Sequence, residues 1–262
     1  MKIAAAAYPI DWHNRWNDYV GKLRVWVRTA AEQGAELLVF PEHAALELGS
    51  LAGEDNAKDL RRVIDAVTAR IKDVDELHAS LAREFKVHVL AASGPIRRED
   101  GKAVNRARLF APDGSHGHQD KVMLSRFESE DWGLEPGTVL RLFETGIGRI
   151  GVLIGYDAEF PLLARALAGA GAEVLLVPSS TDGPRGYWRV RTGAAAVYGP
   201  PDVGFPEDGV VAVGKMDAAG WVHAEVPLEA VRKVRTEGTV LTLFDWPRQQ
   251  GATVETVGLG GG

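Results

Sequence analysis

The sequence predicts an α/β protein in which a mixed β-sheet carries helices on its faces. In the first part of the chain, two apolar runs of strand length enclose an amphipathic segment, with about thirty residues between the runs, a pattern typical of a parallel βαβ unit. In the later part, pairs of short apolar runs flank glycine-containing turns and predict hairpins. No linker-like or repeated segment divides the 262 residues, so we expect one domain over residues 1–262.

The βαβ pattern occupies residues 3–40. Residues 3–8 form the first apolar run. Apolar side chains then recur at three- and four-residue spacing over residues 16–31, which predicts a helix with one buried face that ends near Gly34. Residues 37–40 are continuously apolar and precede Pro41, which predicts a buried strand that ends at this point.

The same patterns predict the remaining elements. Further helices are expected at residues 59–70, 74–85, 160–167 and 228–235. Single strands are expected at residues 87–92, 104–110 and 174–177, and hairpins at 139–143 with 150–154 and at 210–213 with 221–226. The tail from about residue 247 to 262 is polar and glycine-rich, so we expect it to be flexible or to contact a second subunit.

Charge and hydropathy exclude several classes of function. The chain has 30 Lys and Arg residues against 36 Asp and Glu, a net charge of −6, and no long block of like charge. This balance argues against nucleic acid or an anionic membrane surface as the partner. No apolar run approaches the ~18–20 residues that span a bilayer, and no signal-peptide pattern is visible, so we expect no membrane partner and a cytoplasmic location.

The chain contains no cysteine. Disulfides, thiolate metal sites, iron–sulfur ligation and a cysteine nucleophile are therefore all excluded. The last of these exclusions bears directly on the candidate active site.

Three segments carry polar or unusual residues where a buried strand ends. Glu42 directly follows the apolar run 37–40, and ligands of open α/β sheets bind beyond the carboxyl ends of parallel strands. Lys121 follows a polar segment. Residues 151–161 (GVLIGYDAEFP) form a strand, a sharp turn and a helix start, which is a way of presenting a nucleophile beside backbone N–H groups. The residue at the tip of that turn, however, is Gly155.

These segments, in this order, resemble the nitrilase (carbon–nitrogen hydrolase) superfamily of amidases and nitrilases. The resemblance extends from about Lys2 to Trp246. Its motifs are residues 38–42 (LVFPE), Asp120-Lys121 with Glu130 and Pro136-Gly137, residues 151–161, residues 172–178 (AEVLLVP) and residues 187–191 (YWRVR).

The resemblance implies a four-layer α-β-β-α sandwich of two mixed sheets, in subunits that assemble as a homodimer or a higher homo-oligomer. It implies hydrolysis of a small-molecule amide or nitrile, with a small linear amide favoured, and neither a cofactor nor a metal. A cysteine at position 155 would attack the substrate carbon, Glu42 would transfer protons, and Lys121 would stabilise the developing negative charge.

Further site residues follow from the same resemblance. A second glutamate near the lysine orients the site in the family; Glu130 best fits the distance to Pro136-Gly137, with Glu128 as the alternative. We expect Tyr156, Asp157 and Phe160, which follow the nucleophile position, to contact substrate.

The chain departs from the family pattern in two places. Gly155 stands at the nucleophile position, and about thirty or more residues of a family helix and strand are absent after Ala194, by the usual length of such elements. Ser179, Ser180 and Thr181 lie nearby, but residues on a turn point in different directions, so none should inherit the nucleophile's place. A water activated by Glu42 is a further alternative.

Two other patterns are weaker. His116 and His118, near Asp113 and Asp120, could bind a metal, but a polar hairpin loop also explains them. Gly146-x-Gly148 lacks a third glycine and predicts a turn. Two hypotheses therefore stand: an amidase disabled at position 155, and a natural non-catalytic homologue that binds a ligand or takes part in assembly.

Overall fold

The computed structural model describes residues 1–180 and 194–249. Its larger sheet has six strands in the order β11-β1-β2-β3-β4-β5. Their bounds are β1 (Lys2–Ala7), β2 (Leu37–Val39), β3 (His88–Arg97), β4 (Ala103–Phe110), β5 (His116–Asp120) and β11 (Gly220–Glu225). β1, β2 and β3 are parallel to one another, whereas β11 pairs antiparallel with β1, β4 with β3, and β5 with β4, so the predicted mixed sheet and its βαβ unit are confirmed.

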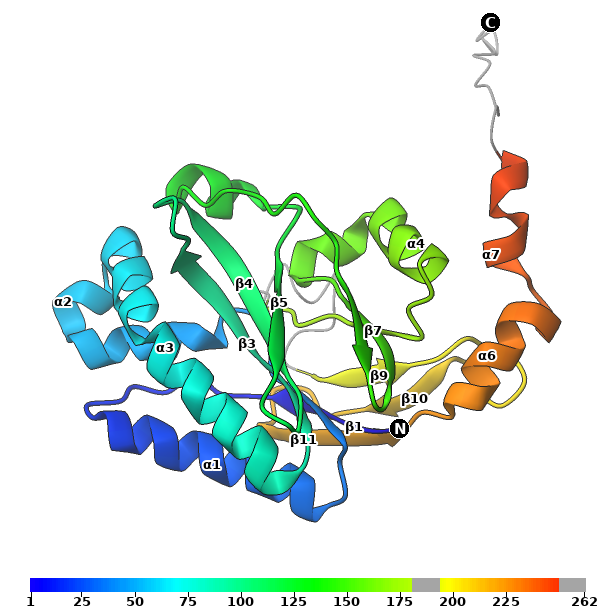
Figure 1. The fold of residues 1–262 in the computed structure, drawn as a ribbon, viewed down its shortest axis with the longest axis horizontal. Coiled ribbons are helices and arrows are strands. Elements are labelled where there is room, and N and C mark those ends of the chain that lie inside the picture. The colour runs from blue at the N-terminus through cyan, green and yellow to red at the C-terminus, as the bar shows by residue number, and fades with distance from the viewer. Residues whose placement is uncertain (181–193, 250–262) are drawn as a thin grey trace, which may run out of the picture.

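Two long helices cover one face of this sheet (Figure 1). They are α1 (Trp16–Glu32) and α3 (Leu60–Phe85), and the apolar side chains of both pack on the sheet in the largest core cluster. The side chain of Asp59 caps α3 by accepting hydrogen bonds from two backbone N–H groups. The prediction of two helices at 59–70 and 74–85 is wrong, because nothing between them breaks the helix and Val67 and Val74 continue one buried stripe.

A second sheet packs on the opposite face of the first. It contains β6 (Leu142–Thr145), β7 (Gly148–Val152) and β8 (Val174–Leu176), with β6–β7 antiparallel and β7–β8 parallel. A second core cluster joins the sheets, with Leu37 and Leu90 from the first meeting Ile150 from the second. Both sheets are therefore mixed, and the predicted hairpin of β6 and β7 is confirmed.

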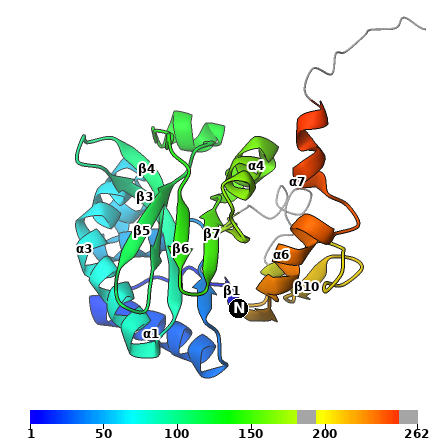
Figure 2. The ribbon, with the colours of Figure 1, turned by 45° about the vertical axis from the view of Figure 1, so that its right-hand side comes forward.

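The helix α4 (Pro161–Gly169) covers the outer face of the second sheet (Figure 2). Its Leu167 packs against Leu153 at the end of β7. The layers run helices, sheet, sheet, helix, which confirms the four-layer α-β-β-α sandwich. Within the described residues, no helix combines the length and apolar character needed to cross a membrane.

The C-terminal part differs from the sequence prediction. β10 (Val210–Val213) pairs with β9 (Ala196–Tyr198), whereas β11 pairs with β1, so the predicted hairpin of residues 210–213 with 221–226 is wrong. β11 instead satisfies the backbone groups of β1, which would otherwise form an open sheet edge. Beyond it lie α6 (Leu228–Glu237), α7 (Thr242–Asp245) and a 3-10 helix (Trp246–Gln249). The rest of the predicted tail, and Thr181 and residues 187–191, lie outside the described residues.

Several short elements have no clear sequence signal. They are β5, the 3-10 helices Ala44–Ala52 and Gly155–Glu159, α2 (Glu54–Ala57) and a π-helical turn (Phe127–Asp131). The segment of β5, interpreted as a polar loop, is an edge strand, and edge strands often carry polar side chains.

Candidate active site

Glu42 lies just beyond the carboxyl end of β2, as the sequence predicts. Its side chain is only 3% exposed. The next residue, His43, has a left-handed backbone conformation (φ 61°), which turns the chain sharply into the 3-10 helix Ala44–Ala52. This turn leaves the Glu42 carboxylate directed into the space between the two sheets.

Lys121 reaches the same space from the end of β5. Its backbone N–H donates to the carbonyl of Asn105 (2.8 Å), which continues the pairing of β5 with β4 beyond the last strand residue. Its Nζ donates to Glu42 Oε1 and to Glu128 Oε2, each at 2.7 Å. The ammonium is buried and bridges two carboxylates from distant parts of the chain.

The glutamate that joins Lys121 is Glu128, not Glu130. Glu128 is 2% exposed, and its Oε2 also accepts hydrogen bonds from the N–H and hydroxyl of Ser125, both at 2.9 Å. Glu130 lies on the surface and pairs with Arg126. The preference for Glu130 fails because both glutamates lie on one helical turn, where side chains two positions apart point to different sides and only one of them can face Lys121.

Asn105 completes the polar cluster, and the sequence prediction missed it. Its Nδ2 donates to Glu42 Oε1 (3.0 Å) and to Glu128 Oε1 (3.1 Å). The side chain is fully buried on β4, and a polar residue on the buried face of a strand was the available signal.

The opposite charges of the cluster offset the cost of burying one another. Burial alone would lower the pKa of Lys121, but Glu42 and Glu128 outweigh it, and the pKa lies above its ordinary value. Burial raises the pKa of Glu128, but the attraction and hydrogen bond of Lys121 outweigh that effect, and the pKa lies below its usual range. The lysine is therefore cationic and Glu128 anionic at neutral pH.

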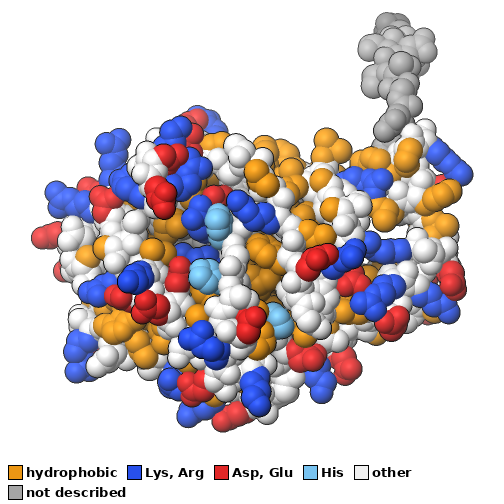
Figure 3. Space-filling model, in the orientation of Figure 1, with side chains coloured by type: hydrophobic (Ala, Val, Ile, Leu, Met, Phe, Trp, Pro, Cys, Tyr) orange, Lys and Arg blue, Asp and Glu red, His pale blue; other side chains and the backbone are white. Residues whose placement is uncertain are grey.

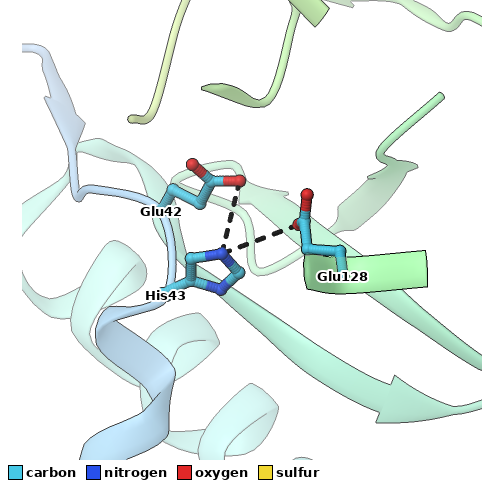
Figure 4. Close-up of side chains that lie close together, drawn as sticks. All are labelled: Glu42, His43 and Glu128. Carbon is cyan, nitrogen blue, oxygen red and sulfur yellow. Dashed lines mark ion pairs between the residues drawn. The ribbon is translucent and has the colours of Figure 1, made fainter. Parts of the chain in front are cut away.

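His43 faces both carboxylates (Figure 4). Its Nε2 lies 3.6 Å from Glu42 Oε1 and 3.6 Å from Glu128 Oε1. Burial lowers the pKa of His43, and the nearby carboxylates do not restore it, so the ring is neutral at neutral pH.

Glu42, His43 and Glu128 are the one group of three potential metal ligands among the described residues, with ligand atoms within 4.8 Å of one another. The Lys121 ammonium, however, already binds the same two carboxylates. A divalent cation would have to displace it, and cation and ammonium would repel each other strongly in so buried a place. The arrangement therefore fits a lysine–carboxylate cluster better than a metal centre.

Gly155 meets this cluster from the second sheet. It follows Ile154 beyond β7, and its N–H donates to the carbonyl of Pro178 (2.8 Å). Its φ of 49° lies in the left-handed region. An ideal Cβ at this position would lie 2.2 Å from Glu42 Oε2, so the glycine backbone packs directly on the Glu42 carboxylate. The three segments singled out in the sequence thus converge on one point.

The carboxylate of Asp157 accepts hydrogen bonds from backbone N–H groups. It is fully buried, and it accepts hydrogen bonds from the N–H groups of Val122 (3.0 Å), Met123 (2.7 Å) and Ile154 (2.9 Å). Burial raises the pKa of its carboxyl, although these three N–H groups act in the opposite direction. This side chain ties the lysine segment to the turn at Gly155, which favours a structural role over substrate contact.

The other expected contact residues lie beside the site. Tyr156 and Phe160 are both half-buried and pack edge to face, with ring centroids 4.9 Å apart. The N–H of Ser180 donates to Glu42 Oε2 (3.1 Å), so this residue touches the cluster through its backbone. Contact of Tyr156 and Phe160 with substrate stays a prediction.

Comparison with known proteins identifies the family. Residues 2–197 match the family model described as carbon–nitrogen hydrolase. The chain belongs to the carbon–nitrogen hydrolase family. A probable hydrolase of Bacillus subtilis is 27% identical over 277 residues, which cover 94% of this chain and 53% of the relative.

Other relatives of this family match about two thirds of the chain. A deaminated glutathione amidase of Synechocystis is 31% identical over 64% of this chain and 63% of its own length. A bifunctional nitrilase/nitrile hydratase of Lupinus angustifolius is 30% identical over 65% of this chain and 50% of its own. The chain therefore spans about half to two thirds of the length of these curated relatives.

Solved structures share the fold. A variant of the Nesterenkonia amidase with acrylamide added at its active-site cysteine is 21% identical, covers 90% of this chain and 97% of its own, and superposes with a TM-score of 0.65. A carbon–nitrogen hydrolase of Helicobacter pylori is 18% identical, covers 96% of this chain and 94% of its own, and gives a TM-score of 0.66.

Proposed function

We propose that this chain is an amidase-type carbon–nitrogen hydrolase whose reaction is severely impaired because Gly155 stands where the nucleophile belongs. The observation that carries the proposal is the direct packing of Gly155 on Glu42, with Lys121 and Glu128 on the other side of the same carboxylate. The family membership and the amidases among the relatives support a small linear amide as the substrate, with a nitrile as the alternative.

With a cysteine at position 155, each residue has a defined part. Glu42 accepts the thiol proton as sulfur attacks the amide carbon, and the Lys121 ammonium and the N–H of Tyr156 stabilise the negative oxygen of the tetrahedral intermediate. Glu42 returns the proton to the leaving ammonia. Water then attacks the thioester with Glu42 as base, which releases the acid and restores the thiol.

With glycine at this position, the covalent step has no nucleophile. Removal of the nucleophile from such a constellation lowers turnover by several orders of magnitude, roughly the loss seen when the whole constellation is removed. Residual hydrolysis would need a water activated by Glu42, but Lys121 and Asn105 already bind Glu42 Oε1 and the backbone of Ser180 binds Oε2.

The test installs the missing group. Gly155→Cys should restore ammonia release from a panel of short aliphatic amides and nitriles, and Gly155→Ala, which adds the same Cβ without sulfur, is the matched control. Glu42→Gln in the Gly155→Cys background should abolish the restored activity. If Gly155→Cys has a native circular dichroism spectrum but releases no ammonia from any amide or nitrile of the panel, the disabled-amidase proposal is wrong.

The alternative is a natural non-catalytic homologue that binds a ligand or serves assembly. The intact cluster favours the first proposal, because two buried carboxylates around a buried lysine contribute little net stability and a site free of catalytic demand has no need to keep them. Binding of acetamide or butyramide to the unaltered chain, with no turnover by Gly155→Cys, would support the alternative.

We further propose that the chain forms a homodimer or a higher homo-oligomer. Leu162 on α4 is 69% exposed and Phe244 on α7 is 67% exposed, and α4 contacts α7. Light scattering of the Leu162→Lys variant against the unaltered chain tests this association. A cytoplasmic location stays a prediction from the sequence.

A further inference from the structure

The helix-covered face of the larger sheet contains a hollow that the proposed reaction does not use. It has a volume of about 520 Å³ and lies at the hairpin of β4 and β5 beside α3. Its lining includes Arg106 and Arg108 from β4, His116 and His118 from β5, and Asp75 from α3. Figure 3 shows basic and histidine side chains around hollowed surface on this side of the molecule.

Strand register explains why these side chains share one face. Arg106 lies opposite Asp120, and Arg108 lies opposite His118. Side chains alternate along a strand, so Asn105, which directly precedes Arg106, points to the opposite face and the Glu42 cluster. The hollow and the candidate active site are therefore on opposite sides of one strand.

Arg108 is the unusual residue of the hollow. It is 4% exposed, and its Nε lies 2.7 Å from the carboxylate of Asp75. The contact is an ion pair without hydrogen-bond geometry, because neither Nε nor Nη1 of Arg108 has a hydrogen-bond partner. Burial lowers the pKa of this guanidinium, with Asp75 opposing the effect only in part. A buried guanidinium with two N–H donors that lack an aligned acceptor is rare in folded proteins.

Of the arginines that line the hollow, Arg108 is the one whose carboxylate partner is poorly aligned; Glu99 and Asp100 also line it, and Asp100 pairs with Arg98. Arg106 is satisfied by Asp120 through two hydrogen bonds, at 2.5 and 2.8 Å, and Arg97 at the rim pairs with Asp65 at 2.5 Å. These two arginines have acceptors of their own, whereas Arg108 has only the poorly aligned Asp75. Guanidinium groups bind carboxylate and phosphate oxygens through two parallel N–H donors, which is the geometry left open at Arg108.

We propose that the hollow binds a small oxyanion, a carboxylate or phosphate group, with Arg108 as its principal ligand and His118 beside it. The ligand enters from the open side of the β4–β5 hairpin. Its oxygens accept hydrogen bonds from the N–H groups of Arg108 that are not aligned with Asp75. This site is independent of turnover at Glu42, so its test needs no active enzyme.

The experiment measures the thermal midpoint Tm of the unaltered chain in inorganic phosphate, in malonate and in sodium chloride of equal ionic strength at pH 7. A bound anion raises Tm because it binds only the folded state. A rise in phosphate alone identifies a phosphate ligand, and a rise in malonate alone identifies a carboxylate. Equal Tm values in all three salts overturn the proposal.

Variants locate the effect. Arg108→Gln should weaken binding by about tenfold or more, from the loss of charge-assisted hydrogen bonds, and Arg61→Gln, at an exposed position on α3, should bind as the unaltered chain does. His118→Asp keeps Arg108 and adds a carboxylate to the half-buried wall, so it should also abolish the rise in Tm. If Arg108→Gln does not fold, His118→Asp decides. Unchanged anion binding in either folded variant overturns the assignment.

Discussion

The carboxylate of Glu42 occupies the space in which a side chain at position 155 would begin. An ideal Cβ on Gly155 would lie 2.2 Å from Oε2 and 2.8 Å from Cδ of Glu42. Any residue other than glycine at this position therefore needs two adjustments, a rotation of the buried glutamate and an unfavourable backbone conformation.

The first prediction concerns stability at this contact. Gly155→Ala should lower the free energy of unfolding by about 1–3 kcal/mol, because φ is 49° and the new methyl group overlaps the carboxylate. Gly21→Ala is the matched control, since Gly21 lies within α1 with open space around its Cβ position, and it should stabilise by about 0.5–1 kcal/mol. Urea unfolding measures both, and equal effects would contradict the overlap.

The second prediction separates the two candidate glutamates. Glu128→Gln removes a buried negative charge from Lys121 and should destabilise by about 3 kcal/mol, as loss of one partner of a buried ion pair does. Glu130→Gln alters only an exposed pair with Arg126 and should change stability by less than about 0.5 kcal/mol. Urea unfolding of the two variants side by side is the measurement. A larger effect at Glu130 would reverse the assignment.

The third prediction concerns acid stability. His78 is fully buried, and burial lowers its pKa to about 4, although a hydrogen bond with the Val74 carbonyl opposes the shift. Between pH 6.5 and 4 the unfolded chain therefore binds more protons at this residue than the folded chain, so stability falls as the pH is lowered through that window. The loss amounts to about 3 kcal/mol over the whole window.

Substitution of the histidine checks this linkage. His78→Phe should make the dependence of stability on pH between pH 6.5 and 4 clearly shallower, because no proton binds at this position in either state. His116→Gln, at an exposed position on β5, should retain the wild-type slope. Urea midpoints at several pH values give the slopes, and a wild-type slope in His78→Phe would assign the effect to other groups.

The fourth prediction tests the role of Asp157. Asp157→Ala leaves three buried backbone N–H groups without their acceptor and should destabilise by about 3 kcal/mol or more. Asp157→Asn keeps one oxygen, which can still accept from Val122 and Met123, so it should be clearly milder. Urea unfolding measures both variants. An equal decrease in the free energy of unfolding would show that the negative charge of Asp157, and not its hydrogen bonds, stabilises this part of the structure.

Much of the fold is encoded locally and could be predicted. The apolar run before Glu42 and the spacing of apolar residues in α1 specify a βαβ unit, and the glycine turn between β6 and β7 specifies their hairpin. Pairing between distant segments is not encoded in this way. β11 follows β10 in sequence with a good turn between them, but it pairs with β1, whose open edge is visible only in the folded sheet.

The site shows the same division. Glu42, Lys121 and Gly155 are marked by their positions at the ends of strands, and their convergence follows from the layering of the sheets. The choice of Glu128 over Glu130 depends on a π-helical turn, and that of Asn105 depends on which face of β4 meets the second sheet. Neither is set by residue type or spacing, because both depend on backbone geometry several residues away.

The position of Glu42 between the sheets also links the site to the folding reaction. Its carboxylate accepts from Lys121 and Asn105 on the first sheet and from the backbone of Ser180, which follows β8 of the second. These contacts span chain separations of 79, 63 and 138 residues. Contacts of such long range form only after large loops have closed. The contact between Glu42 and Ser180 can therefore form only when the two sheets dock, and its presence reports on the completion of the whole sandwich.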